Sequence, residues 1–195
     1  MTDGVIMTDF SAARRAMVDS QLRPQGVNDR AVLAAMGDVR REDFVPASIR
    51  SSAYFDRAIP VEGGVMIPPA PLGRLLTAAE PRPGERALVV APSPGYAAAL
   101  LSHIGLGTLE CLAAADPPRG PFDVILIEGA VAEVPPALTD ALAEGGRLVT
   151  ALLTSGGMTR LAIGRKLDGV VGFSCFADSE IPALAGFTRP PAFTF

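Results

Sequence analysis

The stretch Ala87-Leu88-Val89-Val90-Ala91-Pro92-Ser93-Pro94-Gly95-Tyr96 decides the fold of this chain. A short apolar run, a turn and then an alanine-rich run predict a β-strand, a loop and an α-helix. In α/β proteins such a loop normally holds a nucleotide-type cofactor. The backbone of that loop must approach its ligand closely, which requires glycines. Here one glycine, Gly95, remains, and Pro92 and Pro94 each remove a backbone N–H and fix φ.

The second half of the chain alternates between predicted strands and helices. We expect strands over 86–90, 108–112, 123–127, 148–153, 161–166 and 170–176, helices over 96–104 and 136–143, and a final edge strand within 187–195. This order predicts a mainly parallel sheet with an antiparallel end. Glu128 follows the strongest of these strands, at the edge where open α/β sheets bind ligands.

The first 80 residues predict a helical lobe and a long loop. We expect one helix over 11–22 with Ser11 as its cap, a second after Asn28, and a third over 72–79. The four charged residues 40–43 are typical of a solvated turn. The proline- and glycine-rich segment 53–71 predicts an irregular loop, and long loops are usually functional. A length of 195 residues predicts a single domain, with this lobe over 1–80 and a core over 81–195.

Composition excludes several classes of partner. The net charge is −4, which gives no basic surface for nucleic acid or anionic membranes. No apolar run is long enough to span a membrane, and the N-terminus lacks the basic region of a signal peptide. Cys111 and Cys175 lie far apart without metal-ligand spacing, so we expect two reduced thiols, no metal and a cytoplasmic location.

The landmarks of the chain, taken in order, resemble those of the protein-L-isoaspartate O-methyltransferase family over about residues 12–149. They are Met17-Val18-x-x-Gln21-Leu22, Gly26-Val27-x-Asp29, Val32-Leu33-x-x-Met36, Arg41-Glu42-x-Phe44-Val45-Pro46, Ala53-Tyr54-x-Asp56, Pro83-Gly84, Leu88, Gly95-Tyr96, Pro121-Phe122-Asp123, Gly129-Ala130, Val134-Pro135 and Gly145-Gly146-Arg147-Leu148-Val149. The order and spacing of these pieces, rather than any single one, carry the resemblance.

The resemblance implies a Rossmann-like methyltransferase fold and transfer of a methyl group from S-adenosylmethionine to an isoaspartyl carboxylate, a step in protein repair. It places the cofactor against Ala91, Ser93, Gly95, Tyr96 and Glu110, with Glu110 at the ribose. It places a protein or peptide substrate beside Tyr54, Asp56, Val65 and Met66. Other roles stay open: Glu110 as an ordinary strand-end carboxylate, Gly95 as a tight turn, and Asp56 as a loop cap.

Three departures from the family pattern lead us to expect weak or absent activity. The acid before the cofactor loop is replaced by Val89, and two of the loop glycines by Ala91 and Ser93. The substrate-side hydroxyl is replaced by Ile67, so we assign no catalytic residue. The segment 97–120 is too short for the usual units, which predicts the loss of one βα unit and an exposed edge strand near 108–112.

The alternative is a catalytically inactive relative that acts as a binding or assembly protein, with two copies paired through that edge. His103 is the only histidine in the chain and has no nucleophile partner that the sequence can place. We therefore expect it to serve surface or core packing.

Overall fold

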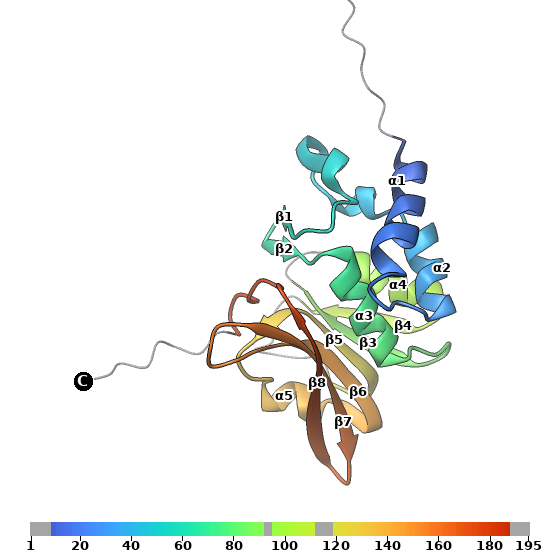
Figure 1. Cartoon of the computed structure of the whole chain (residues 1–195). Helices are drawn as coiled ribbons and strands as arrows, with labels where there is room; N and C mark the ends of the chain where they lie inside the picture. Colours follow the sequence, from blue (N-terminus) through green and yellow to red (C-terminus); the bar gives the residue numbers. More distant parts are fainter. Residues whose placement is uncertain (1–8, 92–94, 112–118, 188–195) are drawn as a thin grey trace, which may run out of the picture.

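The structure is a computed structural model that describes residues 9–91, 95–111 and 119–187, with the backbone alone for 109–111. Six strands form one sheet in the order β4-β3-β5-β6-β7-β8 (Figure 1). They are β3 (Arg86–Val90), β4 (Gly107–Cys111), β5 (Phe122–Val131), β6 (Leu142–Leu153), β7 (Thr159–Leu167) and β8 (Val170–Ser179). The first four are parallel, and β7 and β8 are antiparallel to their neighbours. The predicted sheet is confirmed.

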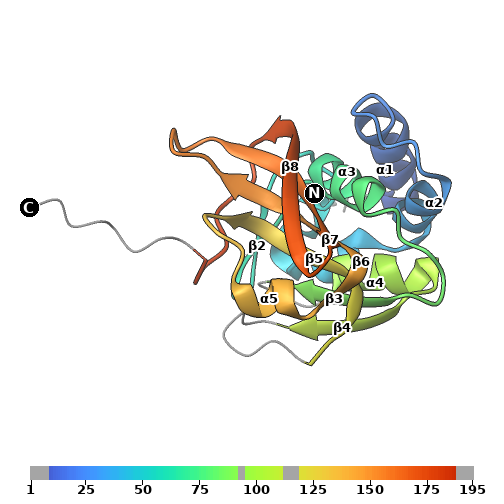
Figure 2. The same ribbon diagram turned by 90° about the horizontal axis from the view of Figure 1, so that it is seen from below.

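The two faces of the sheet are covered by different parts of the chain (Figure 2). On one face α3 (Pro69–Ala79) and α4 (Tyr96–Ile104) pack against the sheet, and α1 (Phe10–Met17) and α2 (Arg30–Asp38) pack outside them. Helix α5 (Pro136–Asp140) covers the other face. Successive strand side chains point to opposite faces. Val89 and Leu126 therefore join the core of the helical side, while Leu88 and Ile125 join the core beneath α5. All four side chains are buried, as expected of parallel strands covered on both sides.

Both predicted N-terminal caps are wrong. Asp9, not Ser11, is the N-cap of α1, since its carboxylate accepts a hydrogen bond from Ala12 N at 3.0 Å. Asp29, not Asn28, is the N-cap of α2, and its carboxylate accepts a hydrogen bond from Val32 N at 2.9 Å. Each aspartate reaches the N–H three residues ahead, which is the geometry of an N-cap. The first helix also changes into a π-helix over Val18–Leu22 instead of continuing as a regular helix.

The loop predicted to be irregular contains a hairpin. Strands β1 (Ile59–Val61) and β2 (Gly64–Met66) pair antiparallel, with Gly63 at φ +81° in the turn. Helix α3 then begins at Pro69, three residues earlier than predicted. Proline is tolerated in the first turn of a helix, because the N–H it lacks has no partner within the helix.

The shortened middle of the chain leaves an open sheet edge. Among the residues described, no strand pairs with the outer side of β4, as expected if one unit is missing. At the opposite edge β8 is the last strand, and Phe187 lies outside any strand, so the predicted final edge strand does not begin there. The rest of that predicted strand, 188–195, lies outside the described residues. Helix α5 ends at Asp140, earlier than predicted, because β6 already begins at Leu142.

Arg147 joins the sheet to the end of α3. The guanidinium is buried and donates hydrogen bonds of 2.8 Å to the carbonyls of Ala79 and Glu80. It also forms a two-pronged ion pair with the Glu85 carboxylate, at 2.8 and 2.9 Å. The last carbonyls of a helix have no partner within that helix. Arg147 supplies the missing donors for α3.

Glu85 makes stability depend on pH. Burial opposes ionisation of Glu85, but hydrogen bonds from Arg147 and from the Arg82 backbone outweigh burial and lower its pKa in the folded protein. A carboxyl with a lowered folded pKa stabilises the fold above its unfolded pKa, and that stability is lost as the pH falls. We expect the free energy of unfolding to decrease between about pH 5 and about pH 3. Denaturant titrations at several pH values measure this free energy. It should fall less with pH in Glu85→Gln than in the wild type, and an equal fall in both proteins would contradict the prediction.

Candidate functional site

The predicted cofactor crevice lies at the carboxyl ends of β3 and β5. Ala91 is buried directly after β3, and Gly95, at φ +96°, begins α4 with Tyr96 as the first helical residue. That φ is in the left-handed region which favours glycine. Ser93 lies outside the described residues. Glu110 is the fourth residue of β4 and lies opposite Val89 in the backbone register, while its side chain is not described.

Arg41 and Glu42 are buried, so the predicted solvated turn is wrong. The two residues are 0% and 1% exposed. The Arg41 Nε donates to the Ala53 carbonyl at 2.8 Å, and its Nη2 donates to the Ile67 carbonyl at 2.7 Å. These two carbonyls lie near the two ends of the loop 53–71, which we call the substrate-type loop. One guanidinium therefore fixes both ends. The signal for this role was present in the family-like motif that begins at Arg41.

The same guanidinium reaches the start of α4. Its Cζ lies 4.9 Å from the ring centroid of Tyr96, within the range of a cation–π contact. The Arg41 Nη1 and the Tyr96 hydroxyl are both buried, and apart from their interaction with each other neither has a hydrogen-bond partner among the described residues. Burial raises the pKa of Tyr96 to about 12, so its hydroxyl stays protonated. Buried polar atoms of this kind normally have a partner.

Glu128 contributes a carboxylate to the same face. It is 4% exposed, and β5 continues beyond it to Val131, so it lies inside the strand rather than at its end. Burial lowers the pKa of Arg41, and the charge of Glu128 acts in the opposite direction. Strand alternation places Glu128 on the helical face of the sheet, together with Val89 of the adjoining strand.

Tyr54, predicted to lie beside the substrate, is a buried anchor of the loop. Its hydroxyl donates to the Glu42 carboxylate, and its carbonyl accepts from Gln21 Nε2 at 2.8 Å. Burial and the neighbouring carboxylate raise the pKa of Tyr54. Burial also opposes ionisation of Glu42, yet hydrogen bonds from Tyr54, the backbone and Arg40 lower its pKa overall. Glu42 is therefore ionised at neutral pH.

The remaining predicted substrate-side residues are distributed around the hairpin. Val65 is half-buried in β2, Met66 is buried, and Ile67 is 1% exposed. Asp56 is exposed and accepts a long hydrogen bond of 3.5 Å from Ala70 N at the start of α3, so it acts as a loop cap. Ile67 therefore places its carbonyl on Arg41 and offers no side-chain hydrogen bond.

Asp56 also lines a cavity of about 520 Å³ that the sequence did not indicate. This cavity lies between the substrate-type loop, the start of α3 and the end of β8. Four of its charged lining residues were not predicted as site residues: Arg57, Arg74, Asp178 and Glu180. They come from three distant segments, so no local pattern could have grouped them.

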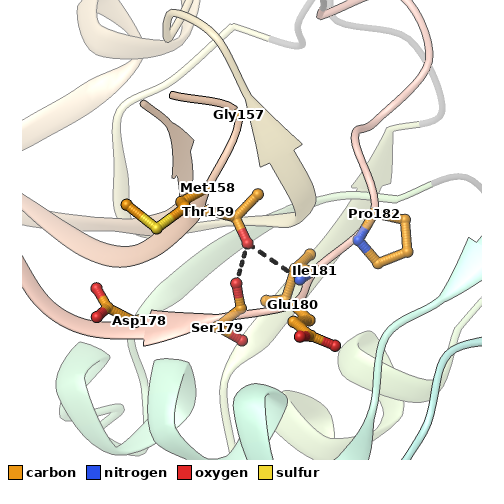
Figure 3. Close-up of a pocket in the computed structure, with 8 residues that line it drawn as sticks. All are labelled: Gly157, Met158, Thr159, Asp178, Ser179, Glu180, Ile181 and Pro182. Atoms are coloured by element: carbon orange, nitrogen blue, oxygen red, sulfur yellow. Dashed lines mark hydrogen bonds between the residues drawn. The ribbon is translucent and has the colours of Figure 1, made fainter. Parts of the chain in front are cut away.

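A second cavity, of about 710 Å³, is also lined by the Asp178–Glu180 segment (Figure 3). The Thr159 hydroxyl donates to the Ser179 carbonyl and accepts from Ile181 N at 3.2 Å. Thr159 thereby fixes the segment that lines both cavities. Met158, 63% exposed, lines this second cavity.

Other candidate groups are accounted for by the described part of the chain. It contains no cluster of three or more residues suited to hold a metal ion, and no helix long and apolar enough to cross a membrane. His103 forms a surface pair with Asp38 at 3.3 Å. Cys175 is a free, exposed thiol.

Comparison with known proteins identifies the family. The family model for protein-L-isoaspartate(D-aspartate) O-methyltransferase matches residues 12–109 and 115–171. The chain belongs to this family. A protein-L-isoaspartate O-methyltransferase from Methylorubrum populi is 38% identical over 188 residues, covering 82% of this chain and 88% of the relative. Another, from Koribacter versatilis, is 36% identical and covers 73% and 78% of the two chains.

The protein-L-isoaspartate O-methyltransferase fold is also found among solved structures. A beta-aspartate methyltransferase from Plasmodium falciparum, solved in complex with S-adenosyl-L-homocysteine, superimposes with a TM-score of 0.73. The match covers 91% of this chain and 99% of that protein, at 17% identity. At that identity the likeness concerns the fold alone. The resemblance found in the sequence and the predicted fold class are both confirmed.

Proposed function

We propose that this protein transfers a methyl group from S-adenosylmethionine to the carboxylate of an isoaspartyl residue in a protein substrate. The observation that carries the proposal is the Arg41 guanidinium, which ties both ends of the substrate-type loop to the first residue of the cofactor helix. A group-transfer enzyme needs this arrangement, because its two ligands must be held against each other.

The described residues fit a polar cofactor. The buried Arg41 Nη1 and Tyr96 hydroxyl have unused hydrogen-bonding capacity among the described residues, beside the start of α4. We propose that Ala91, Gly95 and Tyr96 hold the cofactor, and that the buried Glu128 supplies a carboxylate on the face where Val89 offers none. S-adenosylmethionine, when bound, supplies a methyl group activated by its sulfonium charge.

The residues of this chain have to position the cofactor and the substrate. They do not have to transfer protons. A carboxylate is already a nucleophile at neutral pH, and an in-line displacement requires orientation and little else. Arg41 fixes the loop, Glu42 and Tyr54 brace it, and the buried hairpin residue Met66 keeps water from that side of the loop. The lack of a poised histidine is consistent with this chemistry.

Ile67 favours a second candidate, a non-catalytic binding or assembly protein. Its buried apolar side chain occupies the position of the family hydroxyl. In this candidate the open edge of β4 pairs two copies of the chain. Measurement of mass in solution tests it: a monomer with full methyl-transfer activity would exclude the second candidate.

A direct assay tests the proposed function. An isoaspartyl peptide and the same peptide with normal aspartate are incubated with radiolabelled S-adenosylmethionine, and titration calorimetry measures binding of S-adenosylhomocysteine. We expect label to be incorporated into the isoaspartyl peptide alone. No heat and no incorporation at about 1 mM ligand, a binding free energy weaker than about 4 kcal/mol, would refute the proposal.

Restoring glycines in the cofactor loop should strengthen cofactor binding. We expect the double variant Ala91→Gly, Ser93→Gly to bind S-adenosylhomocysteine about tenfold more tightly, equivalent to about 1.4 kcal/mol. The reason is that glycine lets the backbone approach the ligand more closely. Ser155→Gly, in the exposed turn after β6, is the matched control. Unchanged affinity in the double variant would mean that side chains in this loop do not limit binding.

A further inference from the structure

Two arginines that form no ion pair with any described residue line the cavity of about 520 Å³ beside the substrate-type loop. Arg74, half-buried on α3, has no hydrogen-bond or ion-pair partner among the described residues. Arg57 lies 5.2 Å from the Phe55 ring and reaches only Ser52 Oγ, at 3.5 Å. Neither guanidinium has a carboxylate within ion-pair distance in the described structure. We call this site the Arg57–Arg74 cavity.

Three carboxylates line the same cavity, and none of them pairs with Arg57 or Arg74 in the described structure. Asp56 accepts from Ala70 N, and Asp178 forms an ion pair with Arg160 at 2.9 Å. Glu180 is the remaining acid on the rim. The lining is therefore not positive overall, but both guanidinium groups keep N–H donors that no carboxylate of the described residues accepts. These donors are what the cavity offers to a further carboxylate. Guanidinium binds carboxylate well, because its planar donors match the two oxygens.

The cavity adjoins the place where the substrate would react. Its wall includes Pro68, which directly follows Ile67, the position of the family hydroxyl. Neighbouring residues of an extended peptide are about 3.4 Å apart. A residue one or two positions from the isoaspartyl group would therefore reach the Arg57–Arg74 cavity while that group lies at the reaction site.

We propose that the Arg57–Arg74 cavity binds a carboxylate of the protein substrate, supplied by an acidic side chain close to the isoaspartyl residue. The cavity gives the enzyme a preference for acidic sequence around the damaged site. Glu180 on the rim restricts this preference to a single acidic residue, since a second carboxylate would be repelled. This inference rests on the proposed function, because it assumes an isoaspartyl substrate in the adjoining loop.

The test uses three C-terminally amidated isoaspartyl peptides that differ only in a Glu, Gln or Lys next to the modified residue. A fourth peptide carries Gln and a free C-terminal carboxylate, which separates a side chain from a chain terminus as the source of the anion. Binding is measured by fluorescence anisotropy in the presence of S-adenosylhomocysteine, and KM is measured by methyl transfer. The whole protein is used throughout.

We expect the Glu peptide to bind about tenfold more tightly than the Gln peptide, a typical effect of one charge-assisted contact of about 1.4 kcal/mol. Arg74→Gln should abolish most of this preference and Arg57→Gln part of it. Glu180→Gln should increase affinity for the Glu peptide. Arg50→Gln, an exposed arginine outside the cavity, is the matched control and should change nothing. Thermal unfolding midpoints verify that each variant is folded.

Equal binding of the Glu and Gln peptides to the wild-type protein would overturn the proposal, as would a preference that survives in both arginine variants. If only the free C-terminus strengthens binding, and Arg74→Gln removes that gain, the carboxylate site stands with the chain terminus as its ligand. Methyl transfer without a preference for acidic peptides would refute the proposed role of the Arg57–Arg74 cavity and leave the proposed function standing. Acidic preference in binding without methyl transfer to any peptide would refute the proposed function alone.

Discussion

Arg41→Met is expected to lower the free energy of unfolding by about 3–5 kcal/mol. The substitution keeps an unbranched apolar stem, but it removes the donors to the Ala53 and Ile67 carbonyls. Each buried group left without a partner costs about 1–3 kcal/mol, and the cation–π contact with Tyr96 is lost as well. Urea denaturation of both proteins measures the difference.

Arg40→Met is the matched control for Arg41→Met. The Arg40 side chain is 61% exposed and pairs with Glu42 and Asp43 at 3.3 and 3.4 Å. Arg40 is itself exposed, and Glu42 keeps its hydrogen bond from Tyr54, so the control should lose only about 1–2 kcal/mol. Arg41→Lys retains the charge without the planar fork and should fall between the two. Equal stability of the Arg40 and Arg41 variants would contradict the anchoring role.

Arg147→Met is expected to destabilise the protein to a similar extent, by about 3–5 kcal/mol, because it leaves the Glu85 carboxylate without its buried partner. It also removes the donors that cap the carbonyls of Ala79 and Glu80 at the end of α3. Unlike Arg41→Met, this variant should bind S-adenosylhomocysteine normally under conditions where it is folded, since Arg147 lies at the opposite end of the strands. Denaturation and calorimetry test the two parts.

Arg165→Met provides the control for Arg147→Met. Arg165 is the cross-strand neighbour of Arg147 and pairs with Glu80 at 3.3 Å, but its side chain is 50% exposed. The loss should be within about 1 kcal/mol. A loss as large as that of Arg147→Met would show that the strand pair, and not the cap of α3, is being disturbed.

The strands of this protein could be predicted from the sequence because their signals are local. The run around Ile125 is apolar on both faces, and the glycine before Tyr96 marks the entry to a helix. Helix starts were predicted less accurately. At both wrong caps a second suitable side chain stood one or two positions away, and propensity alone could not choose between them.

The site could be predicted only in part, because its main residue is defined by distant contacts. Arg41 stands among four consecutive charged residues, which locally indicates a solvated turn. Its partners are carbonyls that lie 12 and 26 residues further along the chain. The Arg57–Arg74 cavity is a similar case, since Glu180 reaches the loop only after the chain has passed through the whole sheet. Ser93 and the Glu110 side chain stay predictions.

The segment after β8 returns to the middle of the sheet. Ala130 N donates to the Pro182 carbonyl and Leu184 N to the Ala130 carbonyl, both within 2.9 Å, and a side chain at Gly129 would collide with Leu184. Residues some fifty positions apart thus meet in a parallel bridge between Ala130 and Ala183. A ribosome must therefore release the chain through Leu184 before this contact can form, and a nascent chain that stops at the last strand leaves this part of the central strand uncovered.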